Sequence, residues 1–447
     1  MKQMDGNNCS TITIGLNVIN RIVDSAFYVT CGLLLIIFFF ASPGFYVTNL
    51  PGLSNTYVLI YTIIFLILVL IVLYESNGLT DNYISLLFTF AWSPQYWLLT
   101  VLPLGDDWFI QAQQLPCCMF SEALGHALYK FIFTNELWHI TPFIAPAAGS
   151  VTCYLVLRTL LLLTSDIAEN HRTEWRFFSI LLFVSSGVNL IYFKDYIETT
   201  QIASPFAVLS VYLLIRFCKT GRIVFSYYAA VFWSLAFLVH ASNIFWWPVF
   251  FIISYYVDCY YHRKKCKFCF LLPGLLSIIL IIVIMLMLNS VEGYRIFAGG
   301  AAGGGDGKMF VPLMVASSRY EHYLLFSQSH FSDVATIMSI TNFFFTFAGP
   351  IFLLSWRKIG KSKDLYLEPL SMLFVLIFLA HFTMVFFWNF DLGFPHDYDL
   401  MTSIGMLWLG LPLLLIMNAQ TRPPASAWLV LLCGVIINRL NISLYVS

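Results

Sequence analysis

The stretch HRKKCKFCFLLPGLLSIILIIVIMLML, residues 262–288, puts a basic cluster directly before a long apolar run. The part from 269 to 288 contains no charged side chain. A helix of about 20 apolar residues is long enough to span the roughly 30 Å hydrocarbon core of a bilayer. The stretch therefore predicts a transmembrane helix that begins beside a basic loop.

The whole chain has this character, since 60% of its 447 residues are hydrophobic and only 10% are charged. Soluble domains carry about 25% charged residues. Apolar runs predict about 13 crossings (range 11–13), near 24–41, 56–73, 83–103, 142–163, 177–192, 202–216, 224–240, 244–260, 269–288, 338–355, 370–388, 401–417 and 427–443. We therefore expect an all-α polytopic membrane protein. Its zero net charge gives no basic face for nucleic acid.

The basic loops predict the orientation of these helices. Lys and Arg cluster in 216–222, 262–267, 357–363 and 420–424, and two crossings separate each loop from the next. All four loops thus fall on one side of the membrane, which should be the cytoplasm. Counting crossings backwards places the N-terminus on the same side.

The opposite face receives the polar and acidic loops, 105–141, 194–201, 289–337 and 389–400. Within the first loop, residues 119–134 have apolar side chains at helical spacing, which favours an interfacial amphipathic helix. A short re-entrant helix or a packed surface helix fits the same pattern. Chemistry outside the membrane therefore belongs on the outer face.

Asp106 and Asp107 are adjacent carboxylates at the end of the third predicted crossing. Two carboxylates at the membrane edge are costly unless something pairs with them. They could deprotonate an acceptor hydroxyl, or hold a divalent cation such as Mg²⁺ or Mn²⁺ that grips a phosphate. The alternative is an ordinary solvated helix end. The spacing of cysteine and histidine predicts no metal site of its own.

Four further outward features carry ionisable side chains: Asp195 with Glu198; Arg319, His322 and His330; His396, Asp397 and Asp399; and Arg439. The first pair precedes a helix and could simply cap it. The second group could meet an anion, although single histidines are usually structural. Charges placed on this face, with few at the midplane, favour an enzyme of lipid-borne substrates over an ion-coupled transporter.

Three segments resemble the GT-C superfamily of multi-pass glycosyltransferases. YFKDYIETTQIASPFAVLSVYLL, from 192, looks like the aromatic-Glu segment of some bacterial members. The segment from 322, HYLLFSQSHFSDVATIMSITNFFFTFAGPIFLL, resembles their LFS…H…D…N stretch. The third, WNFDLGFPHDYDLM from 388, resembles their G-x-x-x-DWDLF segment, with Tyr398 in place of Trp and Met401 in place of Phe.

The resemblance implies an inverting transfer of sugar from a polyprenyl-phosphate carrier to an envelope glycan or lipid-linked acceptor, such as O-antigen or another lipopolysaccharide part. It implies a bacterial inner-membrane enzyme that acts at the periplasmic face. Asp106 or Asp107 would be the base, and Glu198 would orient the base or acceptor. Substrate contacts would come from Asp195, Arg319, His322, His330, His396, Asp397, Asp399 and Arg439. No cofactor beyond a divalent cation is expected.

The resemblance divides the chain into three parts: 1–82, with two leading helices; 83–417, the catalytic core; and 418–447, a last helix. In the superfamily the acidic loop commonly follows the first crossing, whereas here it follows the third. Either two helices were added at the N-terminus, or the crossing count differs. A polysaccharide polymerase or ligase, and a lipid-linked oligosaccharide flippase, remain as alternative functions.

Overall fold

The structure is a computed structural model. It describes residues 80–93, 96, 124, 127–128, 131, 135, 141–167, 169–187, 199–262, 271–289, 310–315, 323–346, 368–388, 404–419, 422–431 and 433–434. Within these residues the fold is helical, apart from one antiparallel bridge between Phe310 and Trp388. The all-α prediction is confirmed for this part of the chain. The crossings expected near 24–41 and 56–73 lie outside it.

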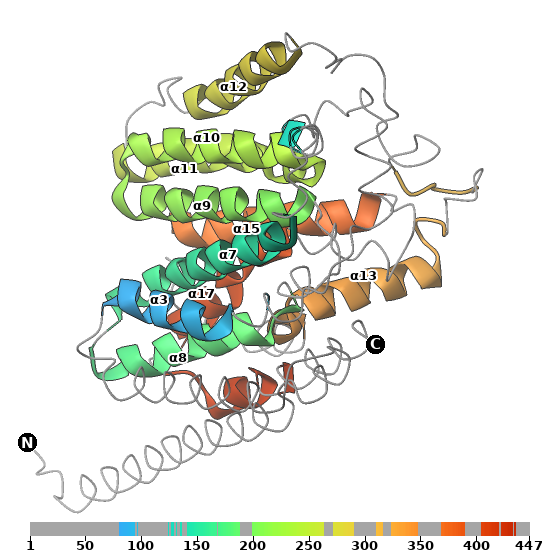
Figure 1. Ribbon diagram of the computed structural model, residues 1–447. Helices are drawn as coiled ribbons and strands as arrows, with labels where there is room; N and C mark the ends of the chain where they lie inside the picture. Colours follow the sequence, from blue (N-terminus) through green and yellow to red (C-terminus); the bar gives the residue numbers. More distant parts are fainter. Residues whose placement is uncertain are drawn as a thin grey trace, which may run out of the picture.

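The helices run in the following order: α3 (Asp81–Trp92), α7 (Thr141–Leu163), η4 (Thr164–Asp166), α8 (Glu169–Ser185), α9 (Thr199–Thr220), α10 (Ile223–Val239), η6 (Ala241–Trp246), α11 (Pro248–His262), α12 (Leu272–Asn289), α13 (Gln328–Thr341), α15 (Pro369–Phe387), η9 (Gly405–Trp408) and α17 (Gly410–Ala419). In Figure 1 most of them lie side by side as one stack. Helix α9 packs between α7 and α10, and α12 covers α10 from the outside.

Three helices are long and apolar enough to cross a membrane: Phe143–Asp166, Thr199–Thr220 and Pro369–Phe387. Shorter apolar helices cover Ile223–Val239, Leu272–Leu288 and Gly405–Met417. These helices coincide closely with six of the expected crossings. Together with the composition they indicate a membrane protein.

The outside of α12 supports this conclusion because it is apolar. Leu275, Ile279, Ile282 and Leu286 are all exposed, and their spacing of three or four residues puts them on one face of the helix. Water would penalise such a continuous apolar stripe, whereas lipid tails would not. The opposite face of α12, with Ser277 and Ile281, is buried against the bundle.

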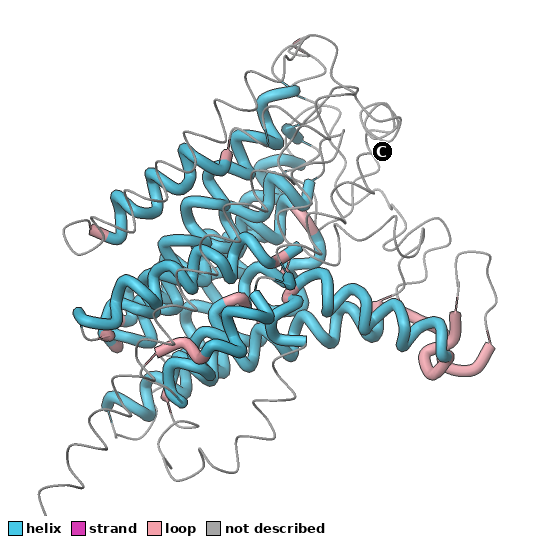
Figure 2. The backbone as a smooth tube through the Cα atoms, turned by 90° about the horizontal axis from the view of Figure 1, so that it is seen from below, coloured by secondary structure: helices cyan, strands magenta, loops and turns pink. Residues whose placement is uncertain are grey.

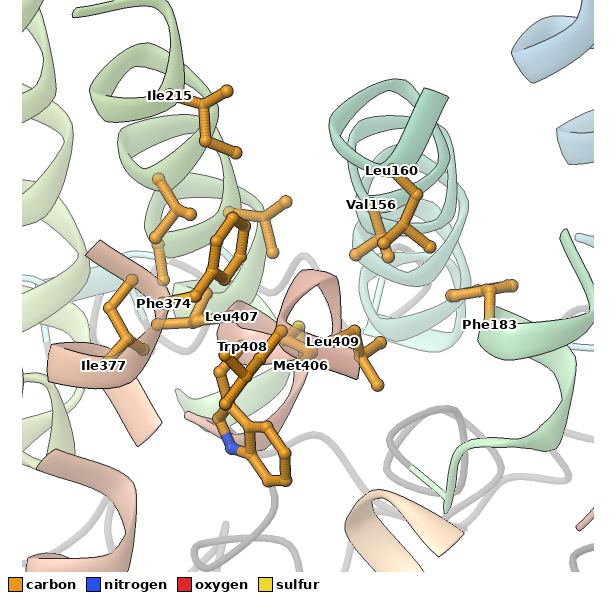
Figure 3. Close-up of a cluster of buried hydrophobic side chains, with 14 of the residues drawn as sticks. Val156, Leu160, Phe183, Ile215, Phe374, Ile377, Met406, Leu407, Trp408 and Leu409 are labelled. Atoms are coloured by element: carbon orange, nitrogen blue, oxygen red, sulfur yellow. The ribbon is translucent and has the colours of Figure 1, made fainter. Parts of the chain in front are cut away.

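The interior is apolar and rich in aromatic rings. Figure 3 shows Phe374 and Ile377 of α15 beside Leu407 and Trp408 of η9, with Val156 and Leu160 of α7 nearby. Trp408 is fully buried, and its indole N–H donates to His381 Nδ1 at 3.0 Å. A buried indole N–H needs such an acceptor, so this bond fixes the ring of Trp408 within the core.

Helices α9 and α10 are joined by a connection of two residues, Gly221 and Arg222. Gly221 has φ 66°, and its N–H bonds to the carbonyl of Phe217 at 2.8 Å. This left-handed C-terminal residue ends α9 as glycine commonly does. The chain can then reverse at once, which explains the close antiparallel pairing of α9 with α10.

Ion pairs join several helix ends on the side of the α9–α10 turn. Arg176 binds Asp81 at 2.7 Å, Lys219 binds Asp166 at 2.9 Å, and Arg422 lies 3.7 Å from a carboxylate oxygen of Glu174. Tyr261 also reaches this side, where its hydroxyl donates to the carbonyl of Cys218 at 2.8 Å. We call this side the basic end of the bundle. Its residues include Lys219 and Arg422, which belong to loops that the sequence predicts to lie on the cytoplasmic side of the membrane.

Helix α13 differs from the expectation because it begins ten residues before the predicted crossing at 338. Ser327 caps it by accepting the N–H of His330 at 3.3 Å. Its buried residues, His330, Val334, Ile337, Met338 and Thr341, share one face. An apolar-run search misses this helix because exposed polar residues interrupt the run. Figure 2 shows α13 reaching beyond the other helices.

Candidate functional site

Of the residues that the sequence proposes for a site, the structure describes His330. Asp106, Asp107, Asp195, Glu198, Arg319, His322, His396, Asp397, Asp399 and Arg439 all lie outside the described residues. Within the described residues, the candidate site therefore consists of His330 and of the residues that flank the acidic segments.

The C-terminal end of α15, opposite to the basic end, is where three chain segments meet. The N–H of Val311 donates to the carbonyl of Phe387 at 3.0 Å, and Phe310 pairs with Trp388 in the antiparallel bridge. The ring of Trp388 also meets Phe245 of η6 edge-on, at 5.4 Å between centroids. Trp388 opens the segment WNFDLGFPHDYDLM. One flank of the acidic segment 389–400 is thus held by contacts to distant parts of the chain.

His330 makes the fourth contact at this place. Its Nε2 lies 2.9 Å from the carbonyl oxygen of Phe386, and its side chain is buried. The ring of Tyr323 lies 4.7 Å from the imidazole, tilted by 34°, and the ring of Phe386 lies at 5.3 Å. The segment that begins at 322 therefore contacts the end of α15, two residues before the segment that begins at 388, although 56 positions separate His330 from Phe386 along the chain.

Burial lowers the pKa of His330, although the bond to Phe386 and the charge of Asp333 act in the opposite direction. Burial thus favours the neutral form of the imidazole. Burial also raises the pKa of Asp333, one turn further along α13, and nearby His330 partly offsets this. The pair offers a neutral imidazole and a carboxylate that is more basic than usual.

The residues that follow the acidic segment 389–400 pack against the same two helices, α13 and α15. A Cβ on Gly405 would clash with Cγ2 of Thr341 and would lie 3.4 Å from Cε1 of His381. Gly405 therefore allows η9 to approach α13 and α15 closely. Both ends of 389–400 are thus anchored on the α13–α15 pair, through His330 and Phe386 on one side and through Gly405 on the other.

Sequence reasoning missed Thr341, Asn342 and His381, which are buried polar residues of this helix pair. The hydroxyl oxygen of Thr341 and the amide nitrogen of Asn342 have no hydrogen-bond partner. The backbone of Asn342 leaves the helical region, with φ −144° and ψ 77°. Their positions as polar residues inside apolar stretches that were predicted to cross the membrane could have indicated them.

The described residues contain no group of three or more His, Cys, Asp or Glu side chains that could hold a metal ion. The acids that could bind a divalent cation lie outside these residues. Cys153, Cys218 and Cys433 are free thiols.

Comparison with known proteins found no matching family model, no matching curated protein and no matching solved structure.

Proposed function

We propose that the chain is an inverting membrane glycosyltransferase that takes sugar from a polyprenyl-phosphate carrier. The acceptor would be an envelope glycan, such as O-antigen, or another lipid-linked molecule. The enzyme would lie in a bacterial inner membrane with its basic end and N-terminus in the cytoplasm. The reaction would take place at the periplasmic face.

One observation carries the proposal: the contact of His330 Nε2 with the carbonyl of Phe386 at 2.9 Å. It brings one of the three segments on which the glycosyltransferase resemblance rests against the end of α15, beside the start of another. Both segments border the end of α15 that lies away from the basic residues, where an outward-facing active site would need them. The close approach of Gly405 to Thr341 holds the other flank of the acidic segment 389–400 against α13.

In this mechanism a carboxylate, Asp106 or Asp107, takes the proton of the acceptor hydroxyl as it attacks the anomeric carbon. The bond from that carbon to the phosphate oxygen breaks, and polyprenyl phosphate leaves. Arg319 and Arg439 would stabilise the leaving phosphate, alone or with Mg²⁺ or Mn²⁺. Glu198 would orient the base or the acceptor. Asp195, His322, His396, Asp397 and Asp399 would shape the sugar site.

The test uses the full chain, purified in detergent, with farnesyl-phosphate-linked glucose, galactose and mannose as donors. We expect release of farnesyl phosphate from at least one donor. Asp106→Asn or Asp107→Asn should reduce this release by about a hundredfold or more, the range for loss of a general base. Asp166→Asn at the basic end is the control and should leave turnover unchanged.

The alternative functions give other results. A flippase would move the intact donor across a vesicle membrane without releasing farnesyl phosphate. A polymerase or ligase would need a polyprenyl-diphosphate-linked glycan as donor. If both aspartate variants, singly and combined, keep full turnover, the catalytic assignment is wrong.

A further inference from the structure

The hydrogen bond to Phe386 fixes the position of the proton on the imidazole of His330. A backbone carbonyl can only accept, so Nε2, at 2.9 Å from that oxygen, must carry the hydrogen. In the neutral ring, Nδ1 then has no hydrogen and presents a lone pair. The structure gives this Nδ1 atom no hydrogen-bond partner, although it is buried.

A buried acceptor without a donor is unfavourable and is therefore uncommon in native proteins. The missing partner of Nδ1 must be a donor. A phosphate dianion offers only acceptor oxygens, so it cannot satisfy this atom. We therefore expect this atom of His330 to meet a hydroxyl group rather than the phosphate of the carrier.

The nearest aromatic ring covers a face of the imidazole and not its edge. Tyr323 stacks over the imidazole face at a tilt of 34°, whereas the lone pair of Nδ1 lies in the imidazole plane. A donor would therefore bond to Nδ1 in the plane of the ring, whereas Tyr323 contacts its face. Phe331, next to His330 on the chain, and Phe326 are exposed rings close to this position in the sequence. Sugars present hydroxyl groups together with apolar C–H faces, and this combination suits such surroundings.

Resting on the proposed function, we infer that Nδ1 of His330 accepts a hydrogen bond from a hydroxyl of the sugar that is transferred. Phe386 and Tyr323 would orient the imidazole, and the lone pair would select a sugar that carries a hydroxyl at one position. His330 is thereby a specificity-determining residue, while the proton transfer of the reaction stays with the aspartates.

Two substitutions separate this role from a structural one. The amide nitrogen of glutamine can replace Nε2, so His330→Gln keeps a donor for Phe386 and loses the Nδ1 acceptor. The side-chain oxygen of asparagine falls near Nδ1, so His330→Asn keeps an acceptor and loses the bond to Phe386. Ser332→Ala, on an exposed position of the same helix, is the matched control.

The decisive measurement is kcat/KM for the accepted donor and for its monodeoxy analogues. In the wild type and in Ser332→Ala, removing one particular hydroxyl should lower kcat/KM about tenfold to a hundredfold. In His330→Gln the same analogue and the parent sugar should differ less than about twofold. In His330→Asn the discrimination should persist, with a lower melting temperature.

If His330→Gln keeps the full discrimination, or if the wild type discriminates against no deoxy analogue, the inference is wrong. The second result would indicate that only water occupies the site. If no donor is turned over at all, the glycosyltransferase proposal fails, and nitrogen-15 NMR of labelled histidine decides the inference separately. A change of the Nδ1 resonance with free glucose, galactose or mannose that is absent in His330→Gln would retain the hydroxyl site. An unchanged resonance would reject it.

Discussion

Arg176 of α8 donates two hydrogen bonds to one carboxylate oxygen of Asp81 at the start of α3, from Nε at 3.0 Å and from Nη2 at 2.7 Å. The Arg176 side chain is only 6% exposed and that of Asp81 is 22% exposed. This pair therefore joins α3 to α8 across 95 residues of sequence, with both charges largely withdrawn from water.

Removing the carboxylate should deprive the buried guanidinium of this charged partner. We expect Asp81→Ala to lower the free energy of unfolding by about 3 kcal/mol, the lower end for a broken buried pair. The measurement is thermal unfolding of the purified protein in detergent. Asp166→Ala is the control, because the Asp166 side chain is 78% exposed and its pair with Lys219 should contribute at most about 1 kcal/mol. If both variants lost the same free energy of unfolding, the buried pair of Arg176 with Asp81 would contribute no more than the exposed pair of Lys219 with Asp166.

Gly405 tests the close approach of η9 to α13 and α15. Gly405→Ala puts a methyl group against Cγ2 of Thr341 and near His381, and should destabilise the protein by about 1–3 kcal/mol through overpacking. Thr341→Ser removes Cγ2 and keeps the hydroxyl, so the double variant should recover part of the loss. The melting temperatures of both single variants and of the double variant check this. If the double variant is no more stable than Gly405→Ala, the new methyl group does not destabilise the protein through Cγ2 of Thr341.

Long apolar runs were enough to predict most described helices. The crossing expected at 224–240 is α10, Ile223–Val239, and the crossing expected at 370–388 is α15, Pro369–Phe387. Hydrophobic length determines such helices locally. The start of α13 was predicted poorly because its Ser327 cap and its one buried face concern single residues in a polar region.

The candidate site could be predicted only in part, for a physical reason. His330 stood out as a polar residue in a segment that resembles the GT-C superfamily. Which of its ring nitrogens carries the hydrogen, however, depends on the carbonyl of Phe386, 56 positions away. Thr341 and His381 can both lie close to η9 because Gly405 has no side chain. Such relations arise from packing between distant helices and leave no local pattern in the sequence.

His171 should make stability depend on pH. Arg422 donates from Nε to His171 Nδ1 at 2.9 Å, which requires an unprotonated Nδ1. Burial, helped by the charge of Arg422, lowers the pKa of His171 in the folded protein. As pH falls below about 6.5, the unfolded state binds the proton first, so this contribution to stability declines until the folded pKa is passed.

Melting temperatures between about pH 7.5 and pH 5.5 would check this dependence. In His171→Asn the amide oxygen can still accept from Arg422 but does not titrate, so this variant should lose less stability on acidification than the wild type. If the melting temperature of both proteins falls equally on acidification, groups other than His171 cause the pH dependence.

The exposed stripe of α12 allows a direct test of membrane contact. Ile279, near the middle of the helix, is 56% exposed, and Leu272 at its start is 45% exposed. An arginine at the centre of a transmembrane helix costs about 2.5–3.5 kcal/mol, whereas near the end its side chain can reach the interface. Ile279→Arg should therefore reduce the folded protein recovered from membranes much more than Leu272→Arg does.

The yield and profile of a fluorescent fusion in size-exclusion chromatography measure this effect. Ser332→Arg, on an exposed polar position of α13, is the control and should stay within about 0.5 kcal/mol of the wild type, as surface substitutions usually do. If the stripe faced water, Ile279→Arg would behave like Ser332→Arg, because a charge on a solvated surface has almost no cost. A graded loss, largest at Ile279, smaller at Leu272 and absent at Ser332, would place the outer face of α12 in lipid.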